Sequence, residues 1–160
     1  HDKTVLDLLG AERKKELFPV GRLDKDTEGL LIITNDGALA HSLLSPKKHV
    51  DKTYFVGLRT PIETSAISQL EGGVDIGEEK NTLPAKVVVL DPLHIELTIH
   101  EGKFHQVKRM LQAVSNEVIY LKRISFGSLS LDPSLDLGEY RELTDEEIQL
   151  LKKAASNEKY

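Results

Sequence analysis

One stretch of the chain decides how the rest is organised: Val20-Gly21-Arg22-Leu23-Asp24-Lys25-Asp26-Thr27-Glu28-Gly29-Leu30-Leu31-Ile32-Ile33-Thr34. Its first part is dense in charge and has a glycine near each end. Its second part, residues 30–34, is a compact apolar run that is followed by turn residues at 35–37. This pattern predicts a charged loop that leads into a buried strand. Such loops often carry functional side chains, although a solvated surface loop has the same composition.

Short strands outnumber helices on both sides of this stretch. Segments rich in β-branched and aromatic residues predict strands at 52–58, 85–90, 94–99 and 118–131. Apolar residues at helical spacing, together with cap and stop signals, predict helices at 4–10, 38–44, 61–70, 104–114 and from 143 onward. Because strands and helices do not alternate regularly, we predict an α+β domain. Its mixed, mostly antiparallel sheet is expected to be flanked by short helices.

Two of these segments allow a more detailed prediction. The turn residues Asp91-Pro92 separate the strands at 85–90 and 94–99, so these strands are expected to form a hairpin. Alternation along 94–99 predicts that only one face of that strand is buried. The helix at 104–114 is expected to bury one apolar face, which consists of Phe104, Val107, Met110, Leu111 and Val114.

The last predicted helix carries its own start signal. Thr144 and Glu147 stand three residues apart ahead of an apolar pattern, which is the spacing of a capping box. Residues 152–160 are polar and terminal, so we expect them to fray.

Length and composition exclude several classes of protein. The chain has 160 residues, of which 39% are hydrophobic and 29% charged, and this is the composition of one ordinary globular domain. No apolar run approaches 18 residues, so no membrane span and no membrane partner are expected. The chain has no cysteine, which excludes a disulfide framework, a thiolate zinc site and a cysteine nucleophile. This usage fits a cytoplasmic protein.

Charge is distributed unevenly along the chain. The net charge of −5 argues at first against a nucleic-acid partner. Residues 100–123, however, hold five Lys or Arg against two Asp or Glu, whereas residues 60–99 hold two against seven. A net acidic chain can therefore still present one basic surface, although charge runs are more often solvated faces.

Two partial motifs fail as metal sites. His100 and His105 are five residues apart with a glycine between them, whereas a zinc helix needs two histidines four residues apart. The run from Asp24 to Gly29 resembles the start of a calcium loop, but its twelfth position is Asn35 instead of glutamate. The glycine-rich nucleotide-binding fingerprints are also missing. We therefore expect no metal site.

The stretch from Gly21 to Leu31 carries a family resemblance. Its pattern Gly-Arg-Leu-Asp-x-x-Thr-x-Gly-Leu-Leu resembles the signature loop of the RNA pseudouridine synthases, in the ribosomal group of the RsuA and RluB/E/F types. Lys52-Thr53-Tyr54, the block at 101–110 and the ending at 137–144 resemble further conserved blocks, in the same order. The letters His105-Gln106-Val107-Lys108-Arg109 are most similar to the RsuA type, which modifies small-subunit (16S) ribosomal RNA.

The resemblance implies the pseudouridine synthase fold and the isomerisation of a uridine to pseudouridine, without cofactor or metal. Asp24 corresponds to the catalytic aspartate, and Lys108 to the basic residue beside it. Tyr54 corresponds to the tyrosine that lies against the target uracil, and Val107 is expected to complete an apolar wall. Arg22 corresponds to a residue that fills the space left by the flipped base. Without the resemblance, Lys108 also fits a solvated helix lysine, and Tyr54 and Val107 also fit core residues. Arg22 also fits a surface ion pair.

The resemblance also implies a partner and a domain organisation. The partner is ribosomal RNA within a small-subunit assembly intermediate, bound by a monomer. Family members usually begin with a small RNA-binding domain and a Lys-Pro-x-Gly strand, which residues 1–160 lack, so we expect a catalytic domain shortened at its N-terminus. The candidate contacts to the RNA backbone are Lys47, Lys48, Lys103, Arg109, Lys122 and Arg123.

Two other function classes remain open at this point. One is a non-catalytic RNA-binding or ribosome-assembly module that has kept the fold. The other is a hydrolase that uses Asp24 together with Asp26 or Glu28 as paired carboxylates. The combined presence of Asp24, Tyr54 and Lys108 favours the isomerase.

Overall fold

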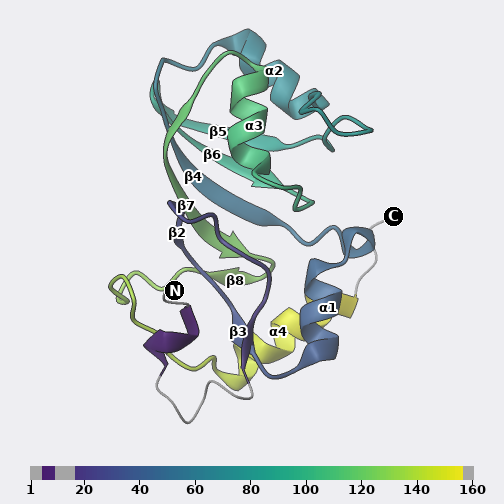
Figure 1. The fold of residues 1–160 in the computed structure, drawn as a ribbon, viewed down its shortest axis with the longest axis vertical. Helices are drawn as coiled ribbons and strands as arrows, with labels where there is room; N and C mark the ends of the chain where they lie inside the picture. Colours follow the sequence, from purple (N-terminus) through teal and green to yellow (C-terminus); the bar gives the residue numbers. More distant parts are fainter. Residues whose placement is uncertain (1–4, 10–16, 157–160) are drawn as a thin grey trace.

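The computed structural model describes residues 5–9 and 17–156 (Figure 1). Its main sheet has the strand order β2-β7-β4-β6-β5, and β8 pairs with β7. Only β2 and β7 run parallel, whereas the other pairs of this sheet are antiparallel. The strands are β2 (Glu28–Gly29), β4 (Lys52–Leu58), β5 (Lys86–Asp91), β6 (His94–Ile99), β7 (Val118–Phe126) and β8 (Leu129–Ser130). A separate antiparallel pair consists of β1 (Phe18–Pro19) and β3 (Ile33–Thr34).

Helices flank this sheet, as the α+β prediction requires. Figure 1 shows α2 and α3 at one end of the strands and α1 and α4 at the other. Within the described residues, no helix has the length and apolarity needed to cross a membrane. The helices are α1 (Gly37–Leu44), α2 (Thr64–Gly72), α3 (Gln106–Ala113) and α4 (Asp145–Ser156), with 3₁₀ turns η1 (Val5–Leu8) and η3 (Pro46–Lys48).

Two apolar clusters hold the elements together. The first lies between the main sheet and helices α2 and α3, and it includes Ile95 and Leu97 from β6 and Met110 from α3. The predicted hairpin of β5 and β6 is confirmed, and Ile95, Leu97 and Ile99 are buried on one face of β6. The second cluster joins α1 and α4 to the end of β7 through residues such as Leu43, Phe126 and Leu151.

The prediction of one buried strand at 30–34 is wrong. Within this run only β3 (Ile33–Thr34) is a strand, because β2 already ends at Gly29, and only Ile32 among residues 30–34 is buried. The reason is a change of partner: Leu30 N–H donates to the Arg123 carbonyl of β7, whereas the Ile32 carbonyl accepts from Val20 N–H beside β1. The two ends of this short apolar run therefore form hydrogen bonds with two different sheets.

Two further predictions at helix ends also need correction. Phe104 does not lie on the apolar face of α3, because its side chain is 72% exposed. The helix begins only at Gln106, after His105 adopts a left-handed conformation with φ of 50°. At the C-terminus, α4 continues to Ser156 instead of fraying from 152, because Leu151 and Ala155 are buried in the second cluster. The predicted helix signals at Thr4 and Gly10, and residues 157–160, lie outside the described part of the chain.

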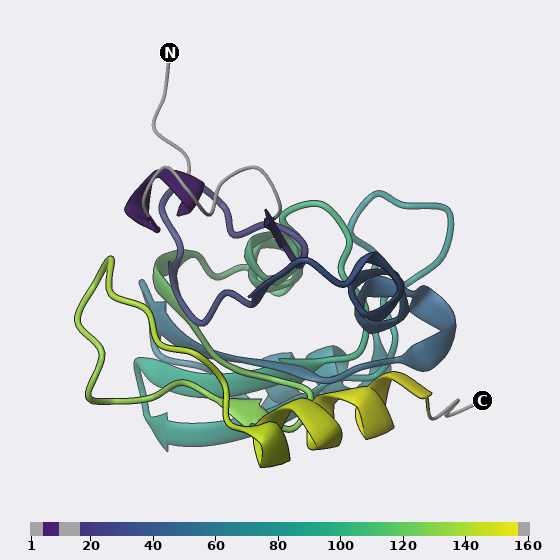
Figure 2. The same cartoon turned by 90° about the horizontal axis from the view of Figure 1, so that it is seen from below.

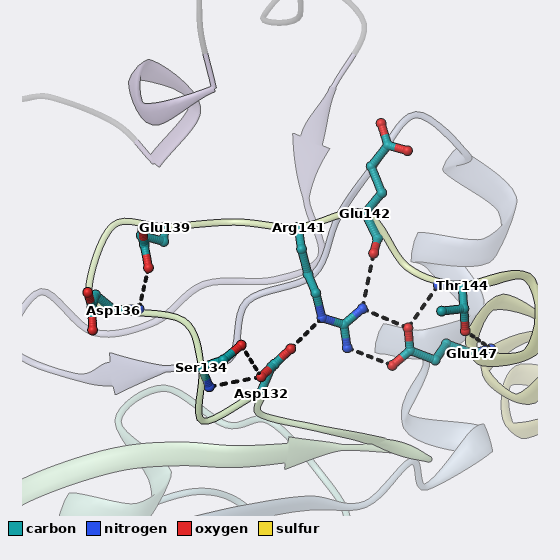
Figure 3. Close-up of polar contacts among 8 residues, drawn as sticks. All are labelled: Asp132, Ser134, Asp136, Glu139, Arg141, Glu142, Thr144 and Glu147. Carbon is teal, nitrogen blue, oxygen red and sulfur yellow. Dashed lines mark hydrogen bonds and ion pairs between the residues drawn. The ribbon is translucent and has the colours of Figure 1, made fainter.

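A polar network fixes the segment that leads into α4 (Figure 3). Glu147 N–H donates to Thr144 Oγ1 at 3.1 Å, and Thr144 N–H donates to Glu147 Oε1 at 2.8 Å, which confirms the capping box. Arg141 donates to Glu147 through two nitrogens, each at 2.8 Å, and to Asp132 at 2.8 Å. Arg141 and the Thr144 backbone N–H together lower the pKa of Glu147 to about 2.

We predict that Arg141→Met lowers the Tm by a few degrees at pH 7. Because the pKa of Glu147 is lower in the folded chain than its ordinary value of 4.5, this stabilisation is complete above pH 4.5 and is lost as the pH falls toward 2. The difference in Tm between wild type and variant should therefore narrow between pH 4.5 and pH 2. Thermal melts across this range test it, with Lys152→Met on the exposed side of α4 as control. A difference in Tm that stays constant with pH would contradict the prediction.

Candidate active site

A cavity of about 140 Å³ lies where the two apolar clusters meet. Ile99, Val107 and Leu121 of the first cluster line it, and so do Val20 and Phe126 of the second. The charged loop after β1 closes one side, and the segment between β6 and α3 closes another. Figure 2 shows the chain before α1 passing beside α3, which brings together segments about 80 residues apart in sequence. The cavity is therefore built by tertiary packing.

Asp24 lies in the wall of this cavity with its side chain 27% exposed. Its Oδ2 is 3.6 Å from Lys108 Nζ, and its Oδ1 is 3.5 Å from His105 Nε2. A turn holds the loop, because Thr27 N–H donates to the Asp24 carbonyl at 2.8 Å. Gly21, with φ of 76°, supplies the left-handed residue at which the loop leaves β1. The structure thus places a carboxylate between two basic side chains of the α3 region.

Lys108 is shared between two carboxylates. Its Nζ donates to Asp26 Oδ1 at 2.5 Å, which is a shorter contact than the one to Asp24. The hydrogen bond to Asp26 is also the main reason why the pKa of Lys108 is raised, and the same bond lowers the pKa of Asp26. Lys108 is therefore a charged, tethered side chain instead of a freely solvated helix lysine.

The structure brings three other predicted residues to the same cavity. Tyr54 of β4 and the buried Val107 of α3 both line it, so a planar ligand would meet a ring and an apolar wall. Arg22 is exposed and also lines it. The acids of the same loop that could form an ion pair with Arg22 make other contacts: Asp26 binds Lys108, and Glu28 accepts from Tyr120 OH. Of the three carboxylates in the loop, only Asp24 lines the cavity, which disfavours a paired-carboxylate hydrolase.

The six candidate RNA-backbone contacts fall into different environments. Lys47 is exposed on η3, Lys48 on the same turn and Lys122 on β7 are half-buried, and Lys103 lines the cavity. Arg109 is committed to the protein itself, because its guanidinium donates to the Phe104 and Ile76 carbonyls and to Glu78. Arg123 is not a surface residue at all, since it is 2% exposed within the sheet. This burial corrects its assignment as a surface phosphate contact.

Two residues at the cavity were not singled out from the sequence as site residues. His105 contacts Asp24 and stacks on the exposed Phe104 ring, with centroids 3.8 Å apart. Lys52 of β4 lines the cavity although its side chain is buried. Both belong to sequence blocks that carried the family resemblance, and a lysine that begins a β-rich segment was the available signal for Lys52. Among the described residues, no three His, Asp or Glu side chains form a group that could hold a metal ion.

Comparison with known proteins identifies the family. The family model described as RNA pseudouridylate synthase matches residues 1–113. The chain belongs to this family. Over 154 residues it is 58% identical to an uncharacterized RNA pseudouridine synthase of Bacillus subtilis, YtzG. The aligned region covers 93% of this chain and 64% of the relative. The family resemblance found in the sequence is thereby confirmed.

Other relatives and solved structures agree with this assignment. Ribosomal small subunit pseudouridine synthase A of Vibrio cholerae is 47% identical over 148 residues, which is 92% of this chain and 64% of the relative. A crystal structure of a pseudouridylate synthase superposes with a TM-score of 0.90 at 43% identity, over 92% of this chain and 65% of that one. An archaeal Nop10–Cbf5 complex, with a TM-score of 0.52 at 16% identity, shares the fold alone. This chain thus spans 64% of the length of each of the two curated relatives named above.

The contact of Lys108 with both Asp24 and Asp26 leads to a prediction about the pKa of Asp26. Lys108→Met should raise the pKa of Asp26 back toward 3.8, because the hydrogen bond that lowers it is lost. Carbon-detected NMR titration of the carboxyl groups measures this change. Lys152→Met on the exposed side of α4 is the control and should leave the pKa of Asp26 unaltered. An unchanged pKa of Asp26 in Lys108→Met would show that the ion pair does not form in solution.

Proposed function

We propose that this protein isomerises a specific uridine of ribosomal RNA to pseudouridine, with Asp24 as the catalytic carboxylate. The observation that carries the proposal is that Asp24 and Tyr54 line one cavity and that Lys108, from a third segment, lies beside Asp24. The membership of the RNA pseudouridylate synthase family supports it. A non-catalytic RNA-binding module would have no need for a cation beside the carboxylate at the cavity.

The reaction exchanges one bond between base and ribose for another. The bond between ribose C1′ and base N1 breaks, the base turns while it is held, and base C5 bonds to C1′. One proton leaves C5 and one is gained at N1, so the product is an isomer and no co-reactant is consumed. Asp24 acts as nucleophile or base in its carboxylate form, and the Lys108 ammonium lies 3.6 Å from its Oδ2. Tyr54 and Val107 hold the base in place by stacking and apolar contact.

The target nucleotide must leave its stacked position to reach Asp24. The cavity is small and is enclosed by the loop after β1 and by the segment before α3, so it admits a base but not a helix of RNA. Flipping a base costs a few kcal/mol. The exposed Arg22 lies beside the cavity, and its planar guanidinium can occupy the vacated position in the RNA stack. We therefore assign the support of base flipping to Arg22.

The ribosomal small subunit is the proposed source of the RNA. Support comes from the identity of 45–47% with several enzymes named ribosomal small subunit pseudouridine synthase A, including that of Escherichia coli. The block from His105 to Arg109 is the part of the site that favours this branch. The substrate is then 16S ribosomal RNA, within an assembly intermediate whose target uridine is accessible to a monomeric enzyme.

Asp24→Asn should abolish pseudouridine formation. We expect the single-turnover rate to fall on the order of 10³-fold or more, as for other carboxylates that act as nucleophile or as acid and base. Asparagine has the size of aspartate but lacks its charge and nucleophilicity. Pseudouridine is mapped in 16S RNA incubated with each protein, and circular dichroism checks the fold. Asp36→Asn is the matched control, because Asp36 caps α1 and asparagine caps a helix equally well.

Three outcomes of this experiment are distinguishable. Loss of activity in Asp24→Asn alone supports the proposal. Full activity of a folded Asp24→Asn protein contradicts the role of Asp24. A wild-type protein that binds 16S RNA but forms no pseudouridine at any position would favour the non-catalytic RNA-binding module instead.

RNA binding should weaken as salt rises, because each neutralised phosphate releases counterions. The logarithm of affinity is expected to fall by about 0.7–0.9 per phosphate contact for each unit of log salt concentration. Replacing the exposed Lys47 by glutamine should remove one phosphate contact and reduce this slope by about 0.7–0.9. Filter binding measures both slopes between roughly 50 and 200 mM salt, a range in which this effect on affinity is large. A flat response of the wild-type protein would exclude an electrostatic RNA interface.

A further inference from the structure

Two buried cations lie where the main sheet lines the cavity, and this side of the cavity is here called its floor. Lys52 of β4 is 8% exposed and Arg123 of β7 is 2% exposed, and both line the cavity. They approach the same aromatic ring: Lys52 Nζ is 5.2 Å and Arg123 Cζ is 5.0 Å from the Phe126 centroid. The two strands are hydrogen-bonded neighbours, so the sheet itself holds both charges in place.

These charges are poorly compensated by the protein. Among the described residues, no carboxylate forms an ion pair within 4.0 Å of either cation. The two acids that act on Lys52 from further away make other bonds: Asp51 contacts His100 at 2.6 Å, and Glu101 accepts from Leu83 N–H and Gln106 Nε2. Arg123 Nε donates to the Leu30 carbonyl, but its Nη2 is buried and has no hydrogen-bond partner in the described chain.

Keeping two such cations buried costs stability. Moving a charged group out of water is expensive unless a counter-charge accompanies it, and neighbouring like charges add to the cost. The pKa of Lys52 records this cost, because burial and then the Arg123 charge lower it from 10.5 to about 8. Lys52 nevertheless remains protonated at pH 7. Two buried cations without an ion-pair partner in a cavity are expected where a ligand brings negative charge.

We propose that Lys52 and Arg123 form an electropositive floor that stabilises the negative charge on the uracil while it is detached from the ribose. This inference rests on the proposed isomerisation. When the C1′–N1 bond breaks, its electron pair stays with the base, which becomes an anion with charge spread over N1, O2 and O4. The charge disappears when C5 bonds to C1′, the C5 proton leaves and N1 is protonated. Fixed positive charges in a water-poor site stabilise such a transient charge more than they stabilise the neutral uridine.

The test compares Lys52→Met, which removes the charge, with Lys52→Arg, which keeps it. Lys86→Met, on the exposed edge strand β5, is the control. Single-turnover rates and RNA affinities are measured from pH 6.5 to pH 9, and thermal melts accompany them. Because the same RNA is used throughout, any titration of the RNA affects all variants equally. The ionisable groups that act on Lys52 are Arg123, Asp51 and Glu101, and the others that line the cavity are Arg22, Asp24, Tyr54, Lys103 and His105.

For Lys52→Met we expect a loss of at least tenfold in maximal rate at pH 7, with RNA affinity changed less than threefold and Tm equal to or above that of wild type. A lysine with a merely structural role would instead lower the Tm. The wild-type rate should fall above pH 8, where Lys52 loses its proton, and Lys52→Arg should lack this fall.

Two results would overturn the inference: a Lys52→Met rate within twofold of wild type, or the same fall above pH 8 in Lys52→Arg. A wild-type protein that forms no pseudouridine would instead refute the proposed function. The two failures are therefore distinguishable, because only the second appears in the wild-type protein.

Discussion

The site depends on one close approach of backbone to backbone, between β2 and β7. Gly29 pairs with Arg123, and a Cβ atom on Gly29 would collide with the Arg123 main chain. Its φ of 113° also lies in the region that favours glycine. Leu30 N–H donates to the Arg123 carbonyl at 2.8 Å, and Arg123 Nε returns a hydrogen bond to the Leu30 carbonyl at 2.9 Å. Because Asp24 stands five residues before this fixed point, the parallel contact decides where its carboxylate lies.

Local sequence patterns correctly predicted the elements that are determined by interactions between residues close in sequence. The alternation of apolar and polar residues along 94–99 correctly identified the buried face of β6, and the spacing of Thr144 and Glu147 correctly identified a helix cap. Both depend on residues within a few positions of one another. The cap also explains why α4 begins at Asp145. The overall α+β class follows from the order of such elements.

The sequence could not show features that depend on distant partners. Residues 30–34 look like one strand, but the hydrogen bonds of Leu30 and Ile32 lead to two different sheets. Phe104 has the spacing of a core residue, yet the left-handed His105 places it outside the helix. Among the site residues, Asp24, Tyr54 and Val107 were recognisable through the family resemblance and lie together at one cavity. The burial of Arg123 was not recognisable, because it follows from the pairing of β7 with strands on both sides.

The acidity of the chain and its proposed RNA partner are compatible because part of the acidic charge is paired locally. Asp132 and Glu147 in the acidic C-terminal part bind Arg141 of the same segment, so they project little free negative charge. Some of the basic residues are also used internally, as Arg109 shows. The cations that line the cavity, by contrast, face a single carboxylate there, Asp24. An RNA or a base anion that enters the cavity responds to this local potential and not to the net charge of the chain, because interactions between exposed charges are screened over about 8 Å at physiological salt.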